Sequence, residues 1–510
     1  MLPELMWLRR SKYALFPNVH EAVLTLGVGQ LVRLRSGMMG LVGQTVARAE
    51  RTVRYQPMHG VSVRRTSPGL DGARTLPSMP EPITTHLTAC CLMGFWGVPN
   101  FGDEWLFRAT QAFLREQFPN IRLTGLVGSA PMERSLGQHQ DDVALLDGFF
   151  PEPSFFAALP GIVRAIRSAE LTLIGGGGLI NDTYTRFSIP RYAMPALLSI
   201  ALGTPVVWWG LGVVPPRRRL LRSLALWTLR HASLVLTRDP DSRAYLQANG
   251  VAALPGEDLS VLGPTSRTEL APLRTDECLL VVNFRDAIPS LAAGRLAFLE
   301  TQAERFDKII LVAAEPCDEP IYREMVDILT QRQPSVVVEV LPATSYTRIQ
   351  QVVAAASQVV SERLHISLFA LGAGVATTVL SYERKIDEVV GRLYPFVGIT
   401  PRARFWSSPP TTFVGNTGTL DIDVPACKRQ IAVQLRLASQ RRPEGFARMM
   451  AALWLCLLLP MGGALAAAIW LKRFTINLNS MRVVRQQRPG SGAFGIGWAA
   501  VGRFSRSLRL

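Results

Sequence analysis

The sequence predicts an α/β protein with two Rossmann-like domains that face a cleft, followed by a C-terminal apolar helix. From Leu87 onward, short apolar runs alternate with longer helical patterns, which is typical of parallel sheets covered on both faces by helices. The alternation occurs in two series, separated by the turn-rich segment 263–268. The uncharged run Met449–Leu471 is long enough to cross a bilayer.

These changes along the chain also predict its boundaries. We expect a basic, poorly structured leader (1–85), an N-terminal Rossmann-like domain (86–265), a C-terminal Rossmann-like domain (275–410), a connector (411–448), a membrane-embedded helix (449–471) and a basic tail (472–510).

Each predicted strand is a short apolar run bounded by polar or turn residues. In the first series the strands are Leu87–Gly94, Ile121–Val127, Leu171–Ile174, Pro205–Trp209, Ser233–Leu236 and Ala252–Leu254, with helices such as Trp105–Gln117 and Arg218–Arg230 between them. In the second series they are Cys278–Asn283, Lys308–Val312, Ser335–Val340, Gln358–Val360 and Thr377–Leu380.

The formal net charge of +16 is confined to the two ends of the chain. Residues 1–85 carry a net charge of +6 and residues 420–510 carry +11, whereas residues 86–419 carry −1. A near-neutral central part argues against a groove for a nucleic-acid backbone, so no nucleic acid is expected as a partner. The leader is either a targeting or membrane-surface segment or an extended N-terminus from a wrongly chosen start codon.

The six cysteines contain no C-x-x-C pair, and no two histidines are spaced for one helix face or turn. We therefore predict no metal site and no disulfide framework, which fits a reducing compartment.

Basic residues flank Met449–Leu471 on both sides. The positive-inside rule favours a cytoplasmic tail, and a single spanning helix with such a tail would place the domains outside the cell. A hairpin or a helix lying on the surface would keep them at the cytoplasmic face, where basic residues bind anionic lipid.

Glycines and acids follow the predicted strands of the first domain. The loop Gly94–Glu104 opens a helix with Asn100, Gly102, Asp103 and Glu104, whose carboxylates either cap the helix or accept hydrogen bonds from sugar hydroxyls. Several glycines also follow these strands, and a glycine backbone can approach a ligand closely. The spacing of these glycines matches neither a dinucleotide-binding nor a nucleoside-triphosphate-binding motif. The glycines in question are Gly175, Gly176, Gly177, Gly178, Gly210 and Gly212, with Asp182 following the first four.

Cations follow strands in both domains. Arg238 either holds a carboxylate or phosphate in the cleft or forms an ion pair with Asp239 that fixes a turn. If a helix starts near Ser361, Glu362 and His365 share one face of it. Lys385 places a second cation at the next strand end, so an anion between His365 and Lys385 is plausible.

The order of these motifs resembles the polysaccharide pyruvyl transferases over about residues 87–392. The motifs are the Gly-Asp-Glu loop, a glycine run with Asp, Gly-x-Gly, Arg-Asp, Ser-x-Arg-x-His and Tyr-x-x-Lys. The resemblance implies a GT-B-like pair of domains, with residues 86–265 on the acceptor side and residues 275–410 on the donor side. It also implies transfer of a pyruvyl group from phosphoenolpyruvate to two hydroxyls of one sugar, which gives a cyclic ketal.

The resemblance also implies roles for these residues. Arg238, Arg363, Lys385 and Arg285 would bind the donor. His365 would be the general acid, or would bind the departing phosphate, and Asp103, Glu104 and Asp182 would orient acceptor hydroxyls or take a proton. The scheme needs no cofactor and no metal.

The expected partners are phosphoenolpyruvate, a glycan or lipid-linked oligosaccharide, and a membrane, with the enzyme on its cytoplasmic face. Trp96 and Trp208-Trp209 depart from the pattern and leave the acceptor open, although buried packing is the better account of them. A GT-B-type glycosyltransferase using a sugar nucleotide and a membrane-anchored glycan-binding protein are the rival hypotheses.

Overall fold

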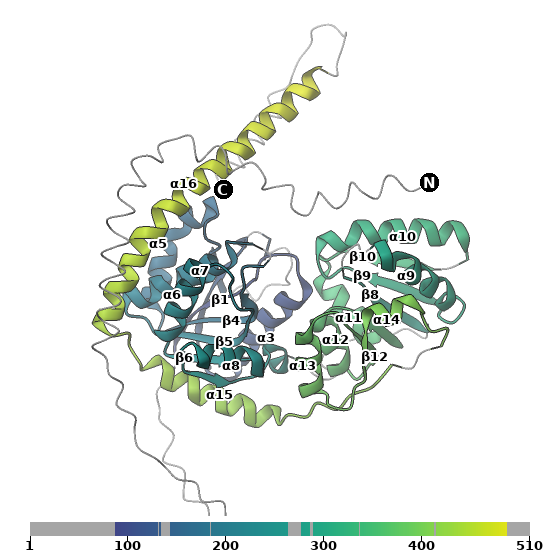
Figure 1. The fold of residues 1–510 in the computed structure, drawn as a ribbon, viewed down its shortest axis with the longest axis horizontal. Coiled ribbons are helices and arrows are strands. Elements are labelled where there is room, and N and C mark those ends of the chain that lie inside the picture. Colours follow the sequence, from purple (N-terminus) through teal and green to yellow (C-terminus); the bar gives the residue numbers. More distant parts are fainter. Residues whose placement is uncertain are drawn as a thin grey trace, which may run out of the picture. The chain divides into compact units, whose positions relative to one another are not determined.

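The structure is a computed structural model that describes residues 87–130, 132–133, 143–183, 185–263, 277–285, 289–335, 337–412 and 415–486. Residues from His86 onward form one compact unit, which contains both sheets (Figure 1). The predicted leader, most of the predicted inter-domain segment and the end of the basic tail lie outside the described residues.

The first domain contains a parallel sheet of seven strands in the order β3-β2-β1-β4-β5-β6-β7. The chain reverses direction across this sheet between β1 and β4, the switch point at which doubly wound folds place their ligands. The strands are β1 (Ala89–Met93), β2 (Arg122–Val127), β3 (Val143–Asp147), β4 (Leu171–Ile180), β5 (Val206–Val213), β6 (Leu234–Thr237) and β7 (Ala253–Pro255).

Helices cover both faces of this sheet because its central strands are buried along almost their whole length. One apolar cluster holds side chains of α5 (Pro153–Ser168), α6 (Ser188–Leu202), α7 (Arg219–Arg230) and α8 (Pro240–Ala248). A second cluster holds those of α3 (Phe101–Gln117) and α15 (Val424–Ser439), together with helices of the second domain.

The second domain contains a parallel sheet of six strands in the order β10-β9-β8-β11-β12-β13, again with a switch point, here between β8 and β11. Its strands are β8 (Leu279–Asn283), β9 (Lys308–Val312), β10 (Val338–Leu341), β11 (Gln358–Ser361), β12 (Ala376–Ser381) and β13 (Ile399–Pro401). Its helices are α9 (Pro289–Gln302), α10 (Glu319–Arg332), α11 (Tyr346–Ala355), α12 (Leu364–Gly372), α13 (Arg384–Leu393) and α14 (Arg402–Ser407).

The fold class predicted from the sequence is therefore confirmed: the chain has two Rossmann-like domains and an apolar C-terminal helix. Strands β3 and β13 were not predicted, because β3 is only half-buried and β13 has three residues. The glycines predicted to follow two strands instead lie within β4 and β5. The helix expected to start near Ser361 starts at Leu364, so Glu362 and His365 share no helix face.

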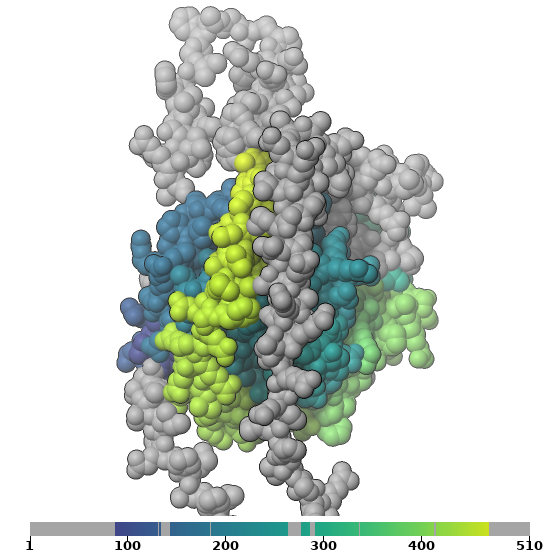
Figure 2. Space-filling view, turned by 60° about the vertical axis from the view of Figure 1, so that its left-hand side comes forward, coloured from purple at the N-terminus to yellow at the C-terminus, as the bar shows by residue number. Residues whose placement is uncertain are grey.

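The end of the chain returns to the first domain. In α15, Lys428 forms an ion pair with Glu116 at 2.7 Å, and Arg436 lies over the ring of Phe118. Next comes α16 (Gly445–Gln486), which packs against α5 and α6 and runs on without a break past Pro460 (Figures 1 and 2). It is longer than the predicted helix, and the hairpin alternative is not observed. Among the described residues, Gly445–Ala468 passes the length and hydropathy test for a membrane span, which by itself is weak evidence.

Candidate functional site

The first domain contributes the loop after β1, which leads into α3. Asn100 caps this helix, because its side-chain oxygen accepts hydrogen bonds from the backbone N–H groups of Gly102 and Asp103. The Asn100 amide also donates to Glu315 of the second domain at 3.1 Å. The cap thus fixes the loop against both domains, with Asp103 in the first turn of the helix.

Gly102 lies directly against the ring of His365. A Cβ atom at position 102 would lie 2.2 Å from Nδ1 of His365, which no side chain tolerates. Only glycine therefore allows the first turn of α3 to meet the start of α12, and two residues predicted from separate motifs are brought into contact.

His365 also meets Asp258, a residue that the sequence analysis did not single out. Nε2 of His365 lies 3.7 Å from Oδ1 of Asp258, which is fully buried. Asp258 accepts hydrogen bonds from Arg238 at 3.1 Å and from the Ser260 backbone at 3.0 Å. Burial alone would raise the pKa of Asp258, but His365, Arg238 and the Ser260 N–H together hold it far below its usual range. Asp258 is therefore a permanent carboxylate beside the imidazole.

Asp103 lies on the other side of this arrangement, close to Gly177 of β4. Burial raises its pKa to about 7, and Glu315 adds to this effect, whereas His365, Arg238 and Lys385 pull the pKa down. Asp103 can therefore give or take a proton near neutral pH, as a general acid or base must. Gly176 and Gly177 have φ of +80° and +96°, which explains why glycines occupy this part of β4.

Arg238 is buried against Gly212 of β5, with 4% of its surface exposed. A Cβ atom on Gly212 would lie 2.8 Å from its Nε, so Gly212 makes room for the guanidinium. The predicted contact with Asp239 is present, although it is long, whereas the binding of a carboxylate or phosphate ligand stays a prediction. Arg238 pairs with Asp258 and lies 3.9 Å from Asp239, and its charge is also felt at Asp103 and Lys385.

The second domain contributes a group of cations around Tyr382. Lys385 pairs with Glu383 at 2.6 Å, and Arg285 pairs with the same carboxylate at 3.0 Å while donating to the Tyr382 hydroxyl. Burial lowers the pKa of Lys385, and the nearby charges of Arg238 and Arg285 lower it further, against the opposite effect of Glu383. Two cations share one carboxylate here, so an additional anion would be attracted to them.

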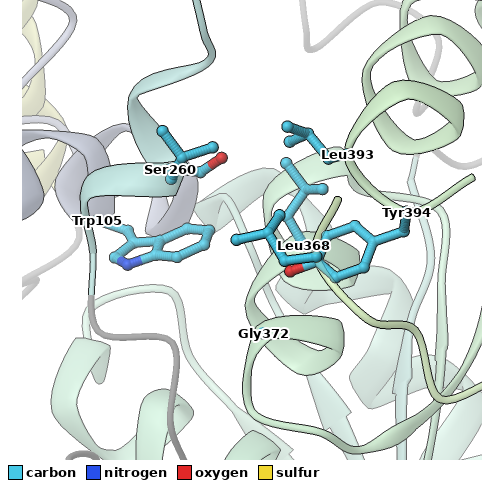
Figure 3. A pocket seen from close by; sticks show the side chains of 8 residues that line it. Trp105, Ser260, Leu368, Gly372, Leu393 and Tyr394 are labelled. Carbon is cyan, nitrogen blue, oxygen red and sulfur yellow. The ribbon is translucent and has the colours of Figure 1, made fainter. Parts of the chain in front are cut away.

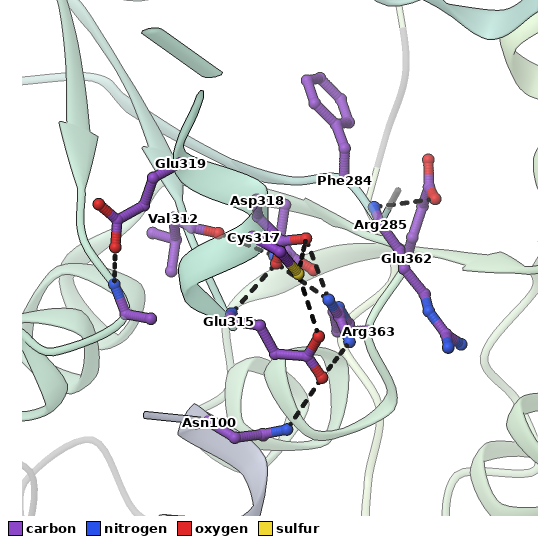
Figure 4. A network of polar contacts seen from close by, with 12 residues as sticks. Asn100, Phe284, Arg285, Val312, Glu315, Cys317, Asp318, Glu319, Glu362 and Arg363 are labelled. Carbon is purple, nitrogen blue, oxygen red and sulfur yellow. Dashed lines mark hydrogen bonds and ion pairs between the residues drawn. The ribbon is translucent and has the colours of Figure 1, made fainter. Parts of the chain in front are cut away.

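Arg363 is held in a network of carboxylates (Figure 4). It pairs with Glu315 at 3.0 Å and makes two hydrogen bonds to Asp318 at 3.0 and 3.1 Å. Asn100 joins the network through Glu315. The charge of Arg363 is thus matched by protein carboxylates, and its observed task is to hold the Asn100 loop against the second domain.

Three acidic residues have partners other than His365. Glu104 accepts from the Gly97 backbone at 2.8 Å, and its burial together with the neighbouring Glu133 raises its pKa well above the usual range. Asp182 accepts from the backbone N–H groups of Arg217 and Arg218, just before α7 begins. Glu362 is fully buried and pairs with Arg295 at 2.6 Å and Arg402 at 3.1 Å.

The remaining glycines serve the packing of the sheet. Gly175 lies against the backbone of Trp209, and Gly210, with φ of +62°, lies against Leu259. Trp208 and Trp209 are fully buried, as their interpretation as packing residues requires.

A small crevice near the site is lined by apolar groups from both domains (Figure 3). Its volume of about 10 Å³ has room for one water at most. The lining residues are Trp105, Ser260, Val261, Leu368, Gly372, Leu393, Tyr394 and Leu420. Among the described residues, no group of three or more His, Cys, Asp or Glu is arranged to hold a metal ion.

The family model described as polysaccharide pyruvyl transferase matches residues 100–384, which is more than half of the chain. The chain belongs to the polysaccharide pyruvyl transferase family. Asp103, Arg238, Asp258 and His365 all lie within the matched segment, and Lys385 is one residue beyond it. Membership makes the chain a transferase that acts in polysaccharide modification.

No curated protein matches this member of the pyruvyl transferase family in sequence. Among solved structures, it is similar to UDP-GlcNAc 2-epimerase from Neisseria meningitidis bound to UDP-GlcNAc, with 12% identity, coverage of 68% of this chain and 99% of the other, and a TM-score of 0.42. It is also similar to α,α-trehalose 6-phosphate synthase from Burkholderia multivorans, with 12% identity, 80% and 100% coverage, and a TM-score of 0.36. An α-glucosyltransferase in complex with UDP-glucose and DNA shows 9% identity, 70% and 95% coverage, and a TM-score of 0.39.

Asp258 could have been found by the rule that identified Arg238. It follows β7, the strand next to β6, and so lies at the same edge of the sheet. Strand β7 is only three residues long, and Asp258 lies three residues beyond its end. The rule was therefore not applied to Asp258, because it was used only for residues directly after a strand.

Proposed function

We propose that this protein transfers the pyruvyl group of phosphoenolpyruvate to two hydroxyls of one sugar in a cell-surface or extracellular polysaccharide, or in its lipid-linked precursor. The observation that carries the proposal is the meeting of His365 with Asp103, Asp258 and Arg238 at the carboxyl ends of both sheets. Family membership supplies the reaction class.

The reaction needs one proton donor and one proton acceptor. The bond between C2 of the donor and its phosphate oxygen breaks, the double bond between C2 and the methylene carbon becomes single, and two bonds from C2 to sugar oxygens form. Of the two hydroxyl protons released, one replaces the proton that the general acid gives to the methylene carbon, and the other leaves with phosphate. No oxidant, reductant or cofactor is required by this balance.

Two residues suit the proton transfers. His365 would be the general acid that protonates the methylene carbon. Asp258, whose Oδ1 lies 3.7 Å from Nε2 of the ring, would stabilise the positive charge of the imidazolium. Asp103, with a pKa of about 7, would take the proton from the attacking hydroxyl.

The cations suit the donor. Phosphoenolpyruvate carries a carboxylate and a phosphate, and the charges of Arg238 and Arg285 both act on Lys385, so that three cations lie within electrostatic reach of one another. Because Asp258 and Glu383 already balance part of that charge, the site would release phosphate after transfer rather than retain it. Arg363 would act by positioning the Asn100 loop.

Since phosphoenolpyruvate is made inside cells, the enzyme would work at the cytoplasmic face of a membrane. The C-terminal apolar helix would keep it near a lipid-linked acceptor.

The test uses the purified full-length protein, phosphoenolpyruvate labelled separately in carbon and phosphorus, and a lipid-linked oligosaccharide extracted from the producing cells. We expect carbon label in acid-labile linkage to the glycan and an equal amount of free phosphate. His365→Gln and Asp103→Asn should abolish both, whereas Asp241→Asn, in an exposed ion pair on α8, should not. Consumption of a nucleotide sugar with no carbon label in the glycan would refute the proposal.

A further inference from the structure

The outer face of α16 is an apolar stripe that no described residue covers. Its members recur every three or four residues and so lie along one side of the helix. They are Phe446, Met449, Leu453, Leu457 and Met461, with exposed fractions that reach 67% at Met461. We define these five residues as the α16 stripe. Between Gly445 and Ala468 the only charged residue is Arg448.

The opposite face of α16 packs against the first domain. Ala447, Ala451 and Leu455 are buried in the cluster formed by α5, α6 and α7. Gly462 is buried against Phe150, so closely that a Cβ atom there would lie 2.2 Å from its ring. Burial recurs as far as Ala466, so one side of the helix is packed over about 20 residues.

This packing is incompatible with a helix that crosses a bilayer over these residues. A spanning helix needs about 20 residues surrounded by lipid or by other spanning segments. Here that same length is fixed along the side of a soluble sheet domain (Figure 2). Lying in the plane of the interface is the arrangement that buries the stripe and leaves the domain in water.

Charge identifies the surface that would cover the stripe. Between Pro153 and Arg230, which include the helices that carry α16, there are nine arginines against only Glu170 and Asp182. Arg164 and Arg167 of α5, which packs against α16, are exposed. Beside the start of α16, the exposed Arg442 and Arg448 reach the carbonyls of Gly203 and Ala201. The remainder of the central part of the chain must be acidic to give its net charge of −1, so the excess positive charge is local.

We propose that the α16 stripe inserts into the interface of an anionic membrane, with the helix parallel to the membrane plane and rigidly attached to the first domain. The inference rests on the packing and charge of α16, and it holds whether or not the proposed reaction is correct. The membrane would then fix the orientation of the domain, since α16 is part of its core.

Vesicle co-sedimentation of the full-length protein tests the proposal. We expect binding to vesicles that mix phosphatidylglycerol with phosphatidylcholine, weaker binding to phosphatidylcholine alone, and release by alkaline carbonate. The Leu453→Glu/Leu457→Glu variant should bind at least about tenfold more weakly, because each glutamate removes an inserted side chain and adds a like charge to the lipid. Its melting temperature should not change, because both positions are exposed.

The matched control is Val337→Glu/Phe396→Glu, which changes two exposed hydrophobic residues of the second domain and should bind like the parent. Maleimide labelling adds a residue-level readout within one sample. Cys456 and Cys278 are both free and exposed. Anionic vesicles should protect Cys456, which lies next to Leu457, and leave Cys278 reactive.

Three results would overturn the proposal. One is resistance of the bound protein to alkaline carbonate, which indicates a spanning helix. Another is equal vesicle binding by the parent and the Leu453→Glu/Leu457→Glu variant. The last is a lipid-free dimer that this variant dissociates, with no vesicle binding by the parent, since the stripe would then join two copies of the chain. Pyruvyl transfer is measured in none of these assays, so failure of the proposed function would leave their outcome unaffected.

Discussion

Asp258 and His365 belong to different domains, and their side chains lie 3.7 Å apart. Asp258 precedes a short 3-10 turn after β7, and His365 is the second residue of α12. Neither domain alone contains the pair. In the proposed reaction the arrangement of the two domains is therefore part of the chemistry, and a change on one side of the interface should alter a proton transfer on the other.

Asp258→Asn should lower kcat/KM by about 100-fold, because the neutral amide no longer stabilises positive charge on the His365 ring. Most of the loss should appear in kcat rather than in the KM for the donor. Steady-state kinetics with both substrates measure this division. Glu257→Gln changes the adjacent carboxylate, which pairs with Arg392, and provides the control. A loss confined to KM would show that Asp258 acts only on donor binding.

The pKa of about 7 at Asp103 predicts how activity depends on pH. Only the carboxylate form accepts a proton, so kcat/KM should rise as the pH increases through about 7. The Asp103→Asn variant should retain little activity and lose this rise. A pH–rate profile of both proteins checks the prediction, and a rise centred near the usual carboxyl pKa of about 4 would contradict it.

The same raised pKa has a consequence for stability. Between the usual carboxyl pKa and about 7, the folded state binds a proton that the unfolded state has released. The contribution of Asp103 to stability therefore falls as the pH rises through this window. Relative to the parent, the Asp103→Asn variant should therefore become more stable as the pH rises from about 5 to 8. Denaturant unfolding of both proteins at each pH measures the difference. The effect should vanish below the usual carboxyl pKa of about 4, where Asp103 is protonated in both states.

Gly102→Ala should lower kcat by about 100-fold, because the added Cβ atom displaces the His365 ring from its place beside Asp258. Gly391→Ala is the matched control. Gly391 lies in α13, and nothing is within 4 Å of an added Cβ atom. That substitution should preserve activity and add about 0.5–1 kcal/mol of stability, as Ala does for Gly within a helix. Equal activity of the two variants would argue against a role for His365.

Glu362→Gln should lower the free energy of unfolding by about 3–5 kcal/mol, because it leaves Arg295 and Arg402 without their buried carboxylate. Urea unfolding of the parent and variant measures the difference. Glu300→Gln removes a partner of Arg332 at the surface and should cost no more than about 1 kcal/mol. A similar small change for Glu362→Gln would indicate that its arginines find other partners.

The sequence predicted most of the strands, because a strand buried on both faces is a short apolar run between turns, but it missed the half-buried β3 and the three-residue β13. It predicted the local neighbourhood of a site residue less well. Glu362 directly follows a strand, as Arg238 does. Its side chain nevertheless contacts Arg295 and Trp406, which are distant in the chain. Arg363 was expected at the donor, and its two carboxylate partners, Glu315 and Asp318, follow a different strand.

The roles of glycines were equally hidden. Motif order marked Gly102 and Gly212 as special, but the reason is a side chain from elsewhere in the fold, His365 in one case and Arg238 in the other. Such contacts depend on how sheets and domains pack together. Periodicity along the chain carries no information about that packing.

The return of α15 and α16 to the first domain means that the backbone passes between the two domains twice. The first crossing lies between Gly263 and Glu277, and the second lies between Ser407 and Val424. Each link has a fixed number of residues and therefore a limited reach. Because the chain joins the domains at two places, both links limit how far Asp258 and His365 can separate.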